Sequence, residues 1–361
     1  MGDMRTYKSD WDEARQRLCD FWAGKPTDRV LASVLASRET PGTTDQIDRR
    51  LPEKFTDPDT VFRNLDIRLA NTFWGGEAVP CHFVYLGAMF SVTFLGAEPK
   101  FHDGGAWYDS PYAGWEDADR MHRDPENRWW KLFCGLARRS AERSGGRYFT
   151  TVGGICASLD VFAELFGTEE TLLAMADDAD GVKHLRDIII EWGKDTYNHV
   201  RSLVSPHQDG FIDWMQVWAP DTVRSVQCDL SVAISPGMFE EFVQDEIREF
   251  LSHVEYGIYH LDGEDQIKHL DLLLAIEPLD MIQFVPVTKP TRQFPRDPML
   301  HIDLFRRILE GGKRAFIYCP PERIEPLLNA IPHQGVYLCV SGCREEKVAR
   351  DVLRTLDRIG M

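Results

Sequence analysis

Two side chains that can bind a metal or move a proton stand at the end of one predicted strand. His260 and Asp262 lie two positions apart in the segment YHLDGED, residues 259–265. Side chains two positions apart on a strand share a face, so the imidazole and the carboxylate are expected to point the same way. A third such residue, Cys343, follows the last predicted strand, in the segment GVYLCVSGC at residues 335–343. Zinc accepts nitrogen, oxygen and sulfur ligands, and its catalytic sites combine three protein ligands with an open position.

These three residues allow two interpretations. If the strand ends converge, then His260, Asp262 and Cys343 form a metal site. In the alternative, His260 and Asp262 are only a hydrogen-bonded pair, and Cys343 is simply the first residue of the last helix.

The elements that must position these residues alternate along the chain. Short β-rich segments are predicted at 29–37, 82–87, 147–153, 211–218, 257–263, 279–287, 314–320 and 335–342. Segments with helical apolar spacing lie between or after them, at 235–254, 264–276, 297–312, 322–331 and 344–360. Ser235 and Pro236 predict a helix start, and Gly311 with Gly312 predicts a helix stop.

Strands separated by single helices predict parallel pairing through right-handed crossovers, and eight of them would close a (β/α)8 barrel, also called a TIM barrel. The carboxyl ends of such strands form the mouth where these barrels do chemistry. The chain is therefore expected to be one α/β barrel domain over residues 1–361. Its irregular, aromatic-rich segment 38–145 is expected to be an insertion packed over one end or a lid over the mouth. An open doubly wound sheet is the alternative fold, but no GxGxxG turn supports a dinucleotide site.

Four further residues are expected at the mouth. In the segment FIDWMQVW, alternation places Trp214 and Gln216 on one face, and Trp218 follows at the strand end. Gln283 is expected to face the same opening. These residues are candidates for binding substrate, with packing beneath the insertion as the alternative for the tryptophans.

Composition excludes several classes of protein. The chain has 361 residues, 43% of them hydrophobic, and a formal net charge of −17. So negative a chain repels nucleic acid. We find no signal peptide and no apolar run of membrane-spanning length. The eight cysteines include no CxxC pair. They are expected to be free thiols, which is typical of a cytoplasmic protein.

Several of these segments together resemble the uroporphyrinogen decarboxylase superfamily over about residues 147–360. The matching stretches are VQCDLSVAISPGMFEEFV, YHLDGEDQIKHLDLLLAI, LDMIQFVP and the terminal SGC. The resemblance is closer to the cobalamin-linked methyltransferase branch, because the decarboxylase has an arginine-rich N-terminal motif, a catalytic aspartate and a GHG turn that are not seen here. The resemblance implies a (β/α)8 barrel.

In the methyltransferase branch, a histidine, a cysteine two residues later and a distant glycine-cysteine hold Zn²⁺. His260 matches the histidine and Cys343 the distant cysteine, whereas Asp262 stands in place of the nearer cysteine. A carboxylate makes the site harder, so another metal or a role in orienting His260 is open. The resemblance also puts Gln227 and Asp229 in the pocket, although Asp229 could instead be a local turn former.

The function expected from this resemblance is metal-dependent methyl transfer between a corrinoid and a thiol or another small acceptor. No corrinoid-binding module is visible, so a separate corrinoid protein would be the partner. The alternative is a metal-free decarboxylase or lyase in which Asp229 and Asp262, with His260, handle a proton on a carboxylated substrate. The oligomeric state stays open.

Overall fold

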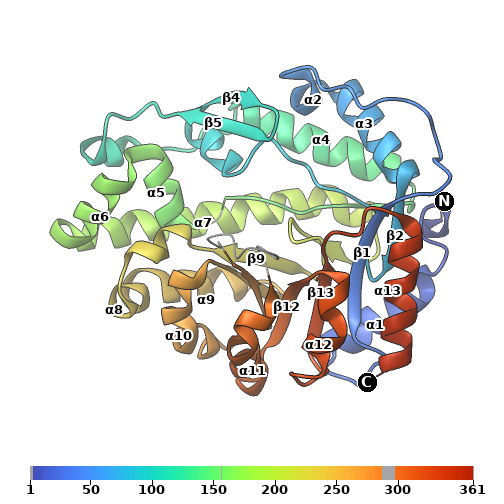
Figure 1. Cartoon of the computed structure of the whole chain (residues 1–361). Coiled ribbons are helices and arrows are strands. Elements are labelled where there is room, and N and C mark those ends of the chain that lie inside the picture. Colours follow the sequence, from blue (N-terminus) through green and yellow to red (C-terminus); the bar gives the residue numbers. More distant parts are fainter. Residues whose placement is uncertain (1–2, 156, 287–296, 361) are drawn as a thin grey trace.

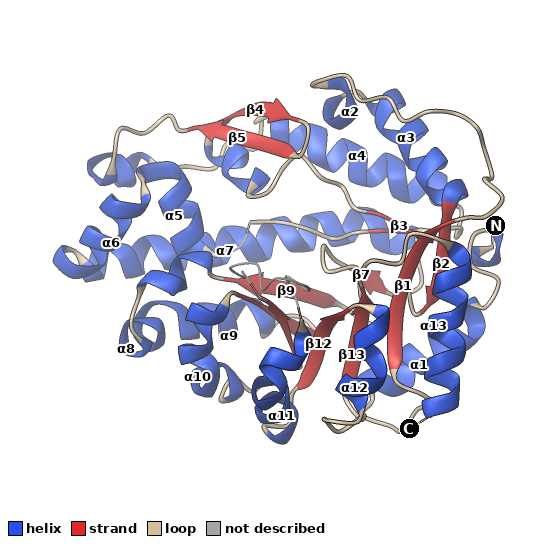
Figure 2. Cartoon of the chain, in the orientation of Figure 1, coloured by secondary structure: helices blue, strands red, loops and turns tan. Residues whose placement is uncertain are grey.

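The computed structural model describes residues 3–155, 157–286 and 297–360. They form a mixed α/β fold around a seven-stranded sheet whose order is β2-β1-β13-β12-β11-β10-β9 (Figure 2). All neighbours in it are parallel except β2, which runs antiparallel to β1. The strands are β1 Leu31–Ser37, β2 Thr72–Gly76, β9 Val223–Gln227, β10 Tyr256–Asp262, β11 Met281–Val285, β12 Arg314–Cys319 and β13 Val336–Val340.

Three short two-stranded sheets accompany the main sheet. One pairs β3 with β6 in parallel, and the others pair β4 with β5 and β7 with β8 antiparallel. Their bounds are β3 Cys81–His82, β4 Glu98–His102, β5 Gly105–Asp109, β6 Phe149–Thr150, β7 Phe211–Ile212 and β8 Trp218–Ala219.

Helices cover the sheet and the far side of the molecule (Figure 1). In that view α10 to α13 lie beside the strands of the main sheet, and α4, α7 and the β4–β5 hairpin form the opposite part. The helices are α1 Trp11–Trp22, α2 Glu53–Thr56, α3 Pro58–Asn71, α4 Arg128–Ser144, α5 Ser158–Phe166, α6 Thr168–Asp177, α7 Ala179–Val204, α8 Pro236–Phe239, α9 Asp245–Leu251, α10 Leu270–Leu274, α11 Ile302–Glu310, α12 Ile324–Leu328 and α13 Glu346–Ile359. Within the described residues, no helix combines the length and the apolar character that crossing a membrane requires.

Most strands of the main sheet were predictable. The segments 29–37, 257–263, 279–287, 314–320 and 335–342 correspond to β1, β10, β11, β12 and β13, with Val287 outside the described residues. The segments 82–87 and 147–153 shrink to the two-residue strands β3 and β6. The two strands at the ends of the main sheet, the antiparallel β2 and the parallel β9, were not predicted.

The prediction of one strand at 211–218 was wrong. The segment folds back on itself: β7 and β8 pair antiparallel, with Phe211 opposite Ala219 and Ile212 opposite Trp218, around a turn at 214–215. Gln216 has a positive φ of 58°, a backbone conformation outside any strand. The alternation used to assign faces in this segment therefore does not hold.

The helix start predicted at Ser235 and Pro236 and the helix end predicted at Gly311 and Gly312 are confirmed. Ser235 caps α8 by accepting a hydrogen bond from the backbone N–H of Met238 at 3.2 Å, and Pro236 is the first helical residue. A π-helical stretch, Glu240–Gln244, joins α8 to α9. At the other boundary, α11 ends at Glu310, directly before Gly311 and Gly312.

The segment 38–145 is more ordered than its composition suggests. It contains the amphipathic helices α3 and α4, the strand β2 on the edge of the main sheet, and the β4–β5 hairpin. It therefore contributes to the main sheet and supplies helices of its own.

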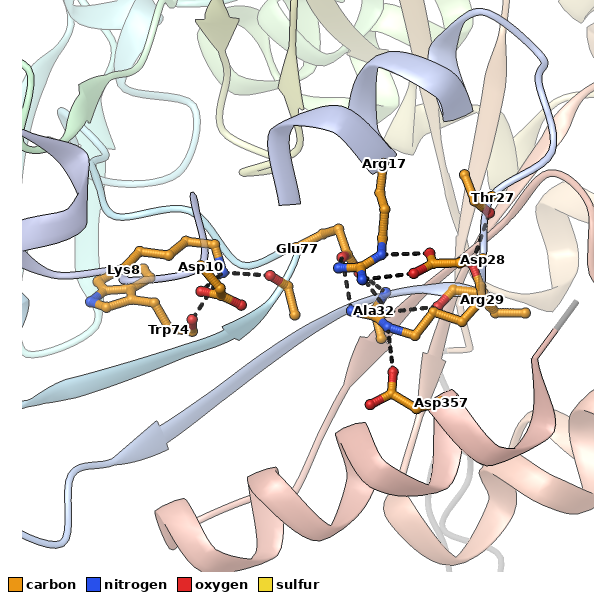
Figure 3. A network of polar contacts seen from close by, with 12 residues as sticks. Lys8, Asp10, Arg17, Thr27, Asp28, Arg29, Ala32, Trp74, Glu77 and Asp357 are labelled. Atoms are coloured by element: carbon orange, nitrogen blue, oxygen red, sulfur yellow. Dashed lines mark hydrogen bonds and ion pairs between the residues drawn. The ribbon is translucent and has the colours of Figure 1, made fainter. Parts of the chain in front are cut away.

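Buried ions tie the N-terminal segment to β2 and the start of β1 to the turn after β2 (Figure 3). The ammonium of Lys8, whose side chain is fully buried, donates to the carbonyl of Trp74 and to Asp10, both at 3.1 Å. Further along, buried Glu77 accepts two hydrogen bonds from Arg29, at 2.9 and 3.0 Å, and one from the backbone N–H of Ala32 at 2.7 Å. These contacts hold β1 against the turn after β2.

Candidate metal centre

Three ligating side chains meet at the carboxyl ends of β9 and β10. His260 and Asp262 are on β10, as predicted, and Asp229 follows the neighbouring parallel strand β9, in which Gln227 pairs with His260. One ligand atom from each of Asp229, His260 and Asp262 lies within 4.8 Å of the other two. We call these three residues the triad.

A chain of hydrogen bonds orients His260. Gln283, opposite His260 on β11, donates from its Nε2 to the hydroxyl of Tyr318 at 2.9 Å. This bond turns the amide oxygen of Gln283 toward Nδ1 of His260, and the two atoms are in contact. An acceptor at Nδ1 places the ring proton there and leaves the lone pair on Nε2, 3.9 Å from the carboxylate of Asp262. Metal-binding histidines in proteins are held in this way.

A buried glutamine fixes Asp262 relative to β9. Gln266 accepts from the backbone N–H of Asp262 at 3.2 Å and donates from its own amide to the carbonyl of Cys228 at 3.1 Å. Its side chain is fully buried. The ends of the two strands are therefore bridged directly beside the triad.

A buried carboxylate fixes Asp229. Asp160, near the start of α5, accepts hydrogen bonds from the backbone N–H groups of Asp229 at 2.9 Å and Leu230 at 2.8 Å. Gln227 donates to the Asp229 carboxylate at 3.1 Å. Asp160 on α5 thus holds the backbone of Asp229, and Gln227 on β9 holds its side chain.

The electrostatics of the triad suit a cation. Loss of hydration, and then the negative charge of Asp262, raise the pKa of Asp229 to about 6. Burial and the charge of Asp229 raise the pKa of Asp160 to about 7. A divalent ion would neutralise this repulsion and favour the ionised form of each carboxyl. Two carboxylates and an imidazole are a harder donor set than the thiolate-containing set expected from the sequence.

A cavity of about 250 Å³ adjoins the triad. Its polar lining includes Asp229 and Gln227. Trp214, another lining residue, meets the ring of His260 edge to face, with centroids 5.3 Å apart. Large apolar side chains, most of them aromatic, wall the cavity, among them Phe83, Tyr85, Met89, Phe90, Phe133 and Trp214. Five of these six residues come from the segment 38–145, which therefore walls the site.

The predicted substrate-binding residues divide into two groups. Trp214, Gln227 and Gln283 lie at the site, as wall, as partner of Asp229 and as support of His260. Gln216 instead faces a second cavity, of about 810 Å³, and accepts a hydrogen bond from the thiol of Cys81 at 3.5 Å. Trp218 is fully buried between Trp11 and Phe149, at 5.3 and 6.1 Å. Gln216 and Trp218 do not lie at the mouth as predicted, because the segment turns back at residues 214–215, before it reaches them.

Cys343, the third metal ligand expected from the sequence, does not lie at this site. Its sulfur does not belong to the triad; the side chain is buried and packs with the main hydrophobic core. Two strands, β11 and β12, separate β13 from β10, so Cys343 starts about 14 Å away along the sheet. Burial also raises the pKa of the Cys343 thiol, which favours the protonated form over the thiolate that binds metal. Asp229 takes the third position.

Asp160, Asp213 and Gln266 are site residues that the sequence did not reveal. Asp160 lies far from β9 along the chain, and its link to Asp229 exists only after folding. Alternation along 211–218 would put Asp213 on the face opposite Trp214 and Gln216, but that strand does not form. Gln266 lies four residues after Asp262, a spacing within reach of a turn, but nothing marks it among ordinary helical glutamines.

Comparison with known proteins adds no assignment. No family model matches the chain, and no curated protein matches it either.

Proposed function

We propose that this chain is an enzyme that binds a divalent metal ion at Asp229, His260 and Asp262 and transforms a small molecule held in the adjoining cavity. The observation that carries this proposal is the convergence of one imidazole and two carboxylates within 4.8 Å, with the imidazole held by Gln283 so that Nε2 faces Asp262. Side chains fixed in this way reduce the loss of freedom on metal binding.

The proposed fold is a (β/α)8 barrel. Six strands, β1 and β9 to β13, already run parallel in one sheet. The parallel pair β3–β6 supplies two more, and the backbone N–H of Val152, just after β6, donates to the carbonyl of Ile212 in β7 at 2.9 Å. In such barrels the carboxyl ends of the strands carry the active site, which is where the triad lies.

The reaction that we favour is methyl transfer, because of the sequence resemblance to cobalamin-linked methyltransferases. A bound metal would supply Lewis acidity and make a thiol or hydroxyl of the acceptor easier to deprotonate. With the ion bound, a carboxylate oxygen of Asp229 that is not held by the metal could accept that proton. The aromatic walls would exclude water while the acceptor atom gains the methyl group that leaves the corrinoid of a partner protein.

Metal-free decarboxylation is the second candidate, favoured by the raised pKa of Asp229. A carboxyl group with a pKa near 6 retains some protonated form at neutral pH. It could deliver a proton to the carbon that loses carbon dioxide. In that reaction the charge of Asp262 would favour the protonated form of Asp229, and His260 would position the substrate.

Elemental analysis of the purified protein tests the choice. For the metal enzyme we expect near-stoichiometric metal in the wild type and in Cys343→Ala. We expect the metal to be lost in His260→Ala and Asp262→Ala. Asp265→Asn, an exposed acid three residues from Asp262, is the matched control and should keep its metal. A folded protein that binds no divalent metal on titration would favour the decarboxylase.

A further inference from the structure

A second polar group lies in the cavity, apart from the triad. Asp213 lines the cavity, yet its side chain is 2% exposed. Its Oδ1 accepts a hydrogen bond from the backbone N–H of Met215 at 3.0 Å. Its Oδ2 has no hydrogen-bond partner among the described residues. Buried carboxylate oxygens are nearly always bonded, so this atom marks a place where a donor is missing.

The hydroxyl of Ser225 shares this situation. Ser225 lines the same cavity, is buried, and its Oγ is also without a partner in the described part of the chain. Ser225 is close enough to Asp213 to lower the pKa of that carboxyl, although the hydroxyl and Oδ2 are not hydrogen-bonded to each other. On β9, Ser225 shares a face with Gln227, about 7 Å further along the strand. Because Gln227 pairs with His260, the Asp213–Ser225 pair lies one such step deeper than the triad.

A neighbouring cation is engaged with other groups. Arg224, which also lines the cavity, donates to the carbonyl of Ile155 at 2.8 Å and stacks over the ring of Phe250 at 4.1 Å. Burial raises the pKa of Asp213 to about 6, and Ser225 and Arg224 oppose that rise. Asp213 is therefore mostly ionised at neutral pH and can accept a strong hydrogen bond.

We propose that Asp213 and Ser225 form a binding subsite for a hydrogen-bond donor, an N–H or O–H group at one end of the substrate. The apolar body of that substrate would lie against the aromatic walls, and its reacting end would reach the triad. The inference rests on the proposed use of this cavity as the substrate site. A cavity of about 150 Å³ holds benzene, so one of about 250 Å³ admits a single ring with a short polar substituent.

Three probes of nearly equal size test the subsite: benzylamine, benzyl alcohol and toluene. Their dissociation constants can be measured by ligand-observed NMR on the full chain. We expect at least one of the two donors to bind the wild type tenfold or more tightly than toluene. Equal affinity for toluene and both donors would overturn the proposal.

Asp213→Asn is the matched variant. The backbone N–H of Met215 would bind the amide oxygen, so the NH₂ group would occupy the Oδ2 position. That group cannot accept a hydrogen bond from the ligand. We expect the preference for donors to fall below threefold, while Asp209→Asn, an exposed acid in the same loop region, keeps it. An unchanged preference in Asp213→Asn would contradict the proposal. Thermal unfolding checks the fold, and if this variant does not fold, Ser225→Ala must lower the preference at least threefold instead.

His260→Ala separates this inference from the proposed metal site. It should lose metal and keep the preference for donors, whereas Asp213→Asn should keep metal and lose the preference. A wild type without metal that still discriminates donors would overturn the metal proposal alone.

Discussion

Gln283 and His260 stand opposite each other on the neighbouring strands β11 and β10, and the amide oxygen of Gln283 contacts Nδ1 of the imidazole. The hydroxyl of Tyr318 accepts a hydrogen bond from the amide nitrogen of Gln283, so the amide oxygen is the atom that faces His260. The lone pair of His260 is thereby directed to the side where Asp262 lies.

Replacing Gln283 should weaken metal binding without removing a ligand. In Gln283→Leu, Nδ1 loses its acceptor and the ring its orientation, and we expect metal affinity to fall about 10- to 100-fold. Isothermal titration with zinc and manganese measures the change. Gln283→Glu keeps an acceptor and should stay within a few-fold of the wild type, as should Gln46→Leu at the surface. Wild-type affinity in Gln283→Leu would mean that the contact does not orient a ligand.

Removing Glu77 should destabilise the fold strongly. The side chain is fully buried, and its loss leaves the guanidinium of Arg29, itself 4% exposed, without its buried partner. Breaking a buried ion pair on one side costs about 3–5 kcal/mol, so the free energy of unfolding of Glu77→Ala should fall by about that amount. Urea denaturation measures it. Asp3→Ala, which breaks the exposed pair with Arg5, should change stability far less.

Glu246 should make stability depend on pH. Burial raises its pKa in the folded protein to about 7, from 4.5, although Ser158 donates to both carboxylate oxygens at 2.6 Å. The folded state therefore binds this proton more tightly than the unfolded chain. The resulting stability is fully present below pH 4.5 and is lost as the pH rises through about 7.

Glu246→Gln should remove this dependence. Between pH 4.5 and pH 8 we expect the free energy of unfolding of the wild type to fall by about 3 kcal/mol relative to that of the variant. Denaturant titrations across this range give the difference. Glu249→Gln, on the same helix and exposed, should follow the wild type. Parallel curves for Glu246→Gln and the wild type would show that Glu246 is not buried as described.

Trp218 should contribute to stability and not to the site. Its indole is fully buried against Trp11 and Phe149, so Trp218→Ala should lower the free energy of unfolding by about 3–5 kcal/mol. Metal content should be unchanged. Trp107→Ala, with 71% of the residue exposed, should shift stability by no more than about 0.5 kcal/mol. A Trp218 variant with normal stability and altered metal binding would restore its predicted place at the mouth.

Local patterns in the sequence predicted the elements that build the sheet. β10, β11, β12 and β13 are short apolar runs between amphipathic helices, and their order along the chain fixes parallel pairing. β9 was missed because its sequence, VRSVQ, contains three polar residues. Arg224 is accommodated in the interior by stacking on Phe250 and Tyr197, a tertiary effect that periodicity does not contain.

Two of the three triad residues could be predicted in the same way. His260 and Asp262 could be placed on one face because they share a strand. The third residue could not be chosen between Asp229 and Cys343 from spacing, since that depends on the order of strands in the sheet. The fold-back of β7 on β8 likewise required knowing that Gln216 adopts a positive φ.

The central claim is that Asp229, His260 and Asp262 share one metal ion. The most direct measurement is a crystal structure of the protein grown with a divalent metal, with anomalous scattering recorded at that metal's absorption edge. The account predicts an anomalous peak about 2.0–2.3 Å from Nε2 of His260 and from a carboxylate oxygen of each aspartate. A well-ordered triad with no peak, or a peak bound by Cys343 without Asp229, would contradict it.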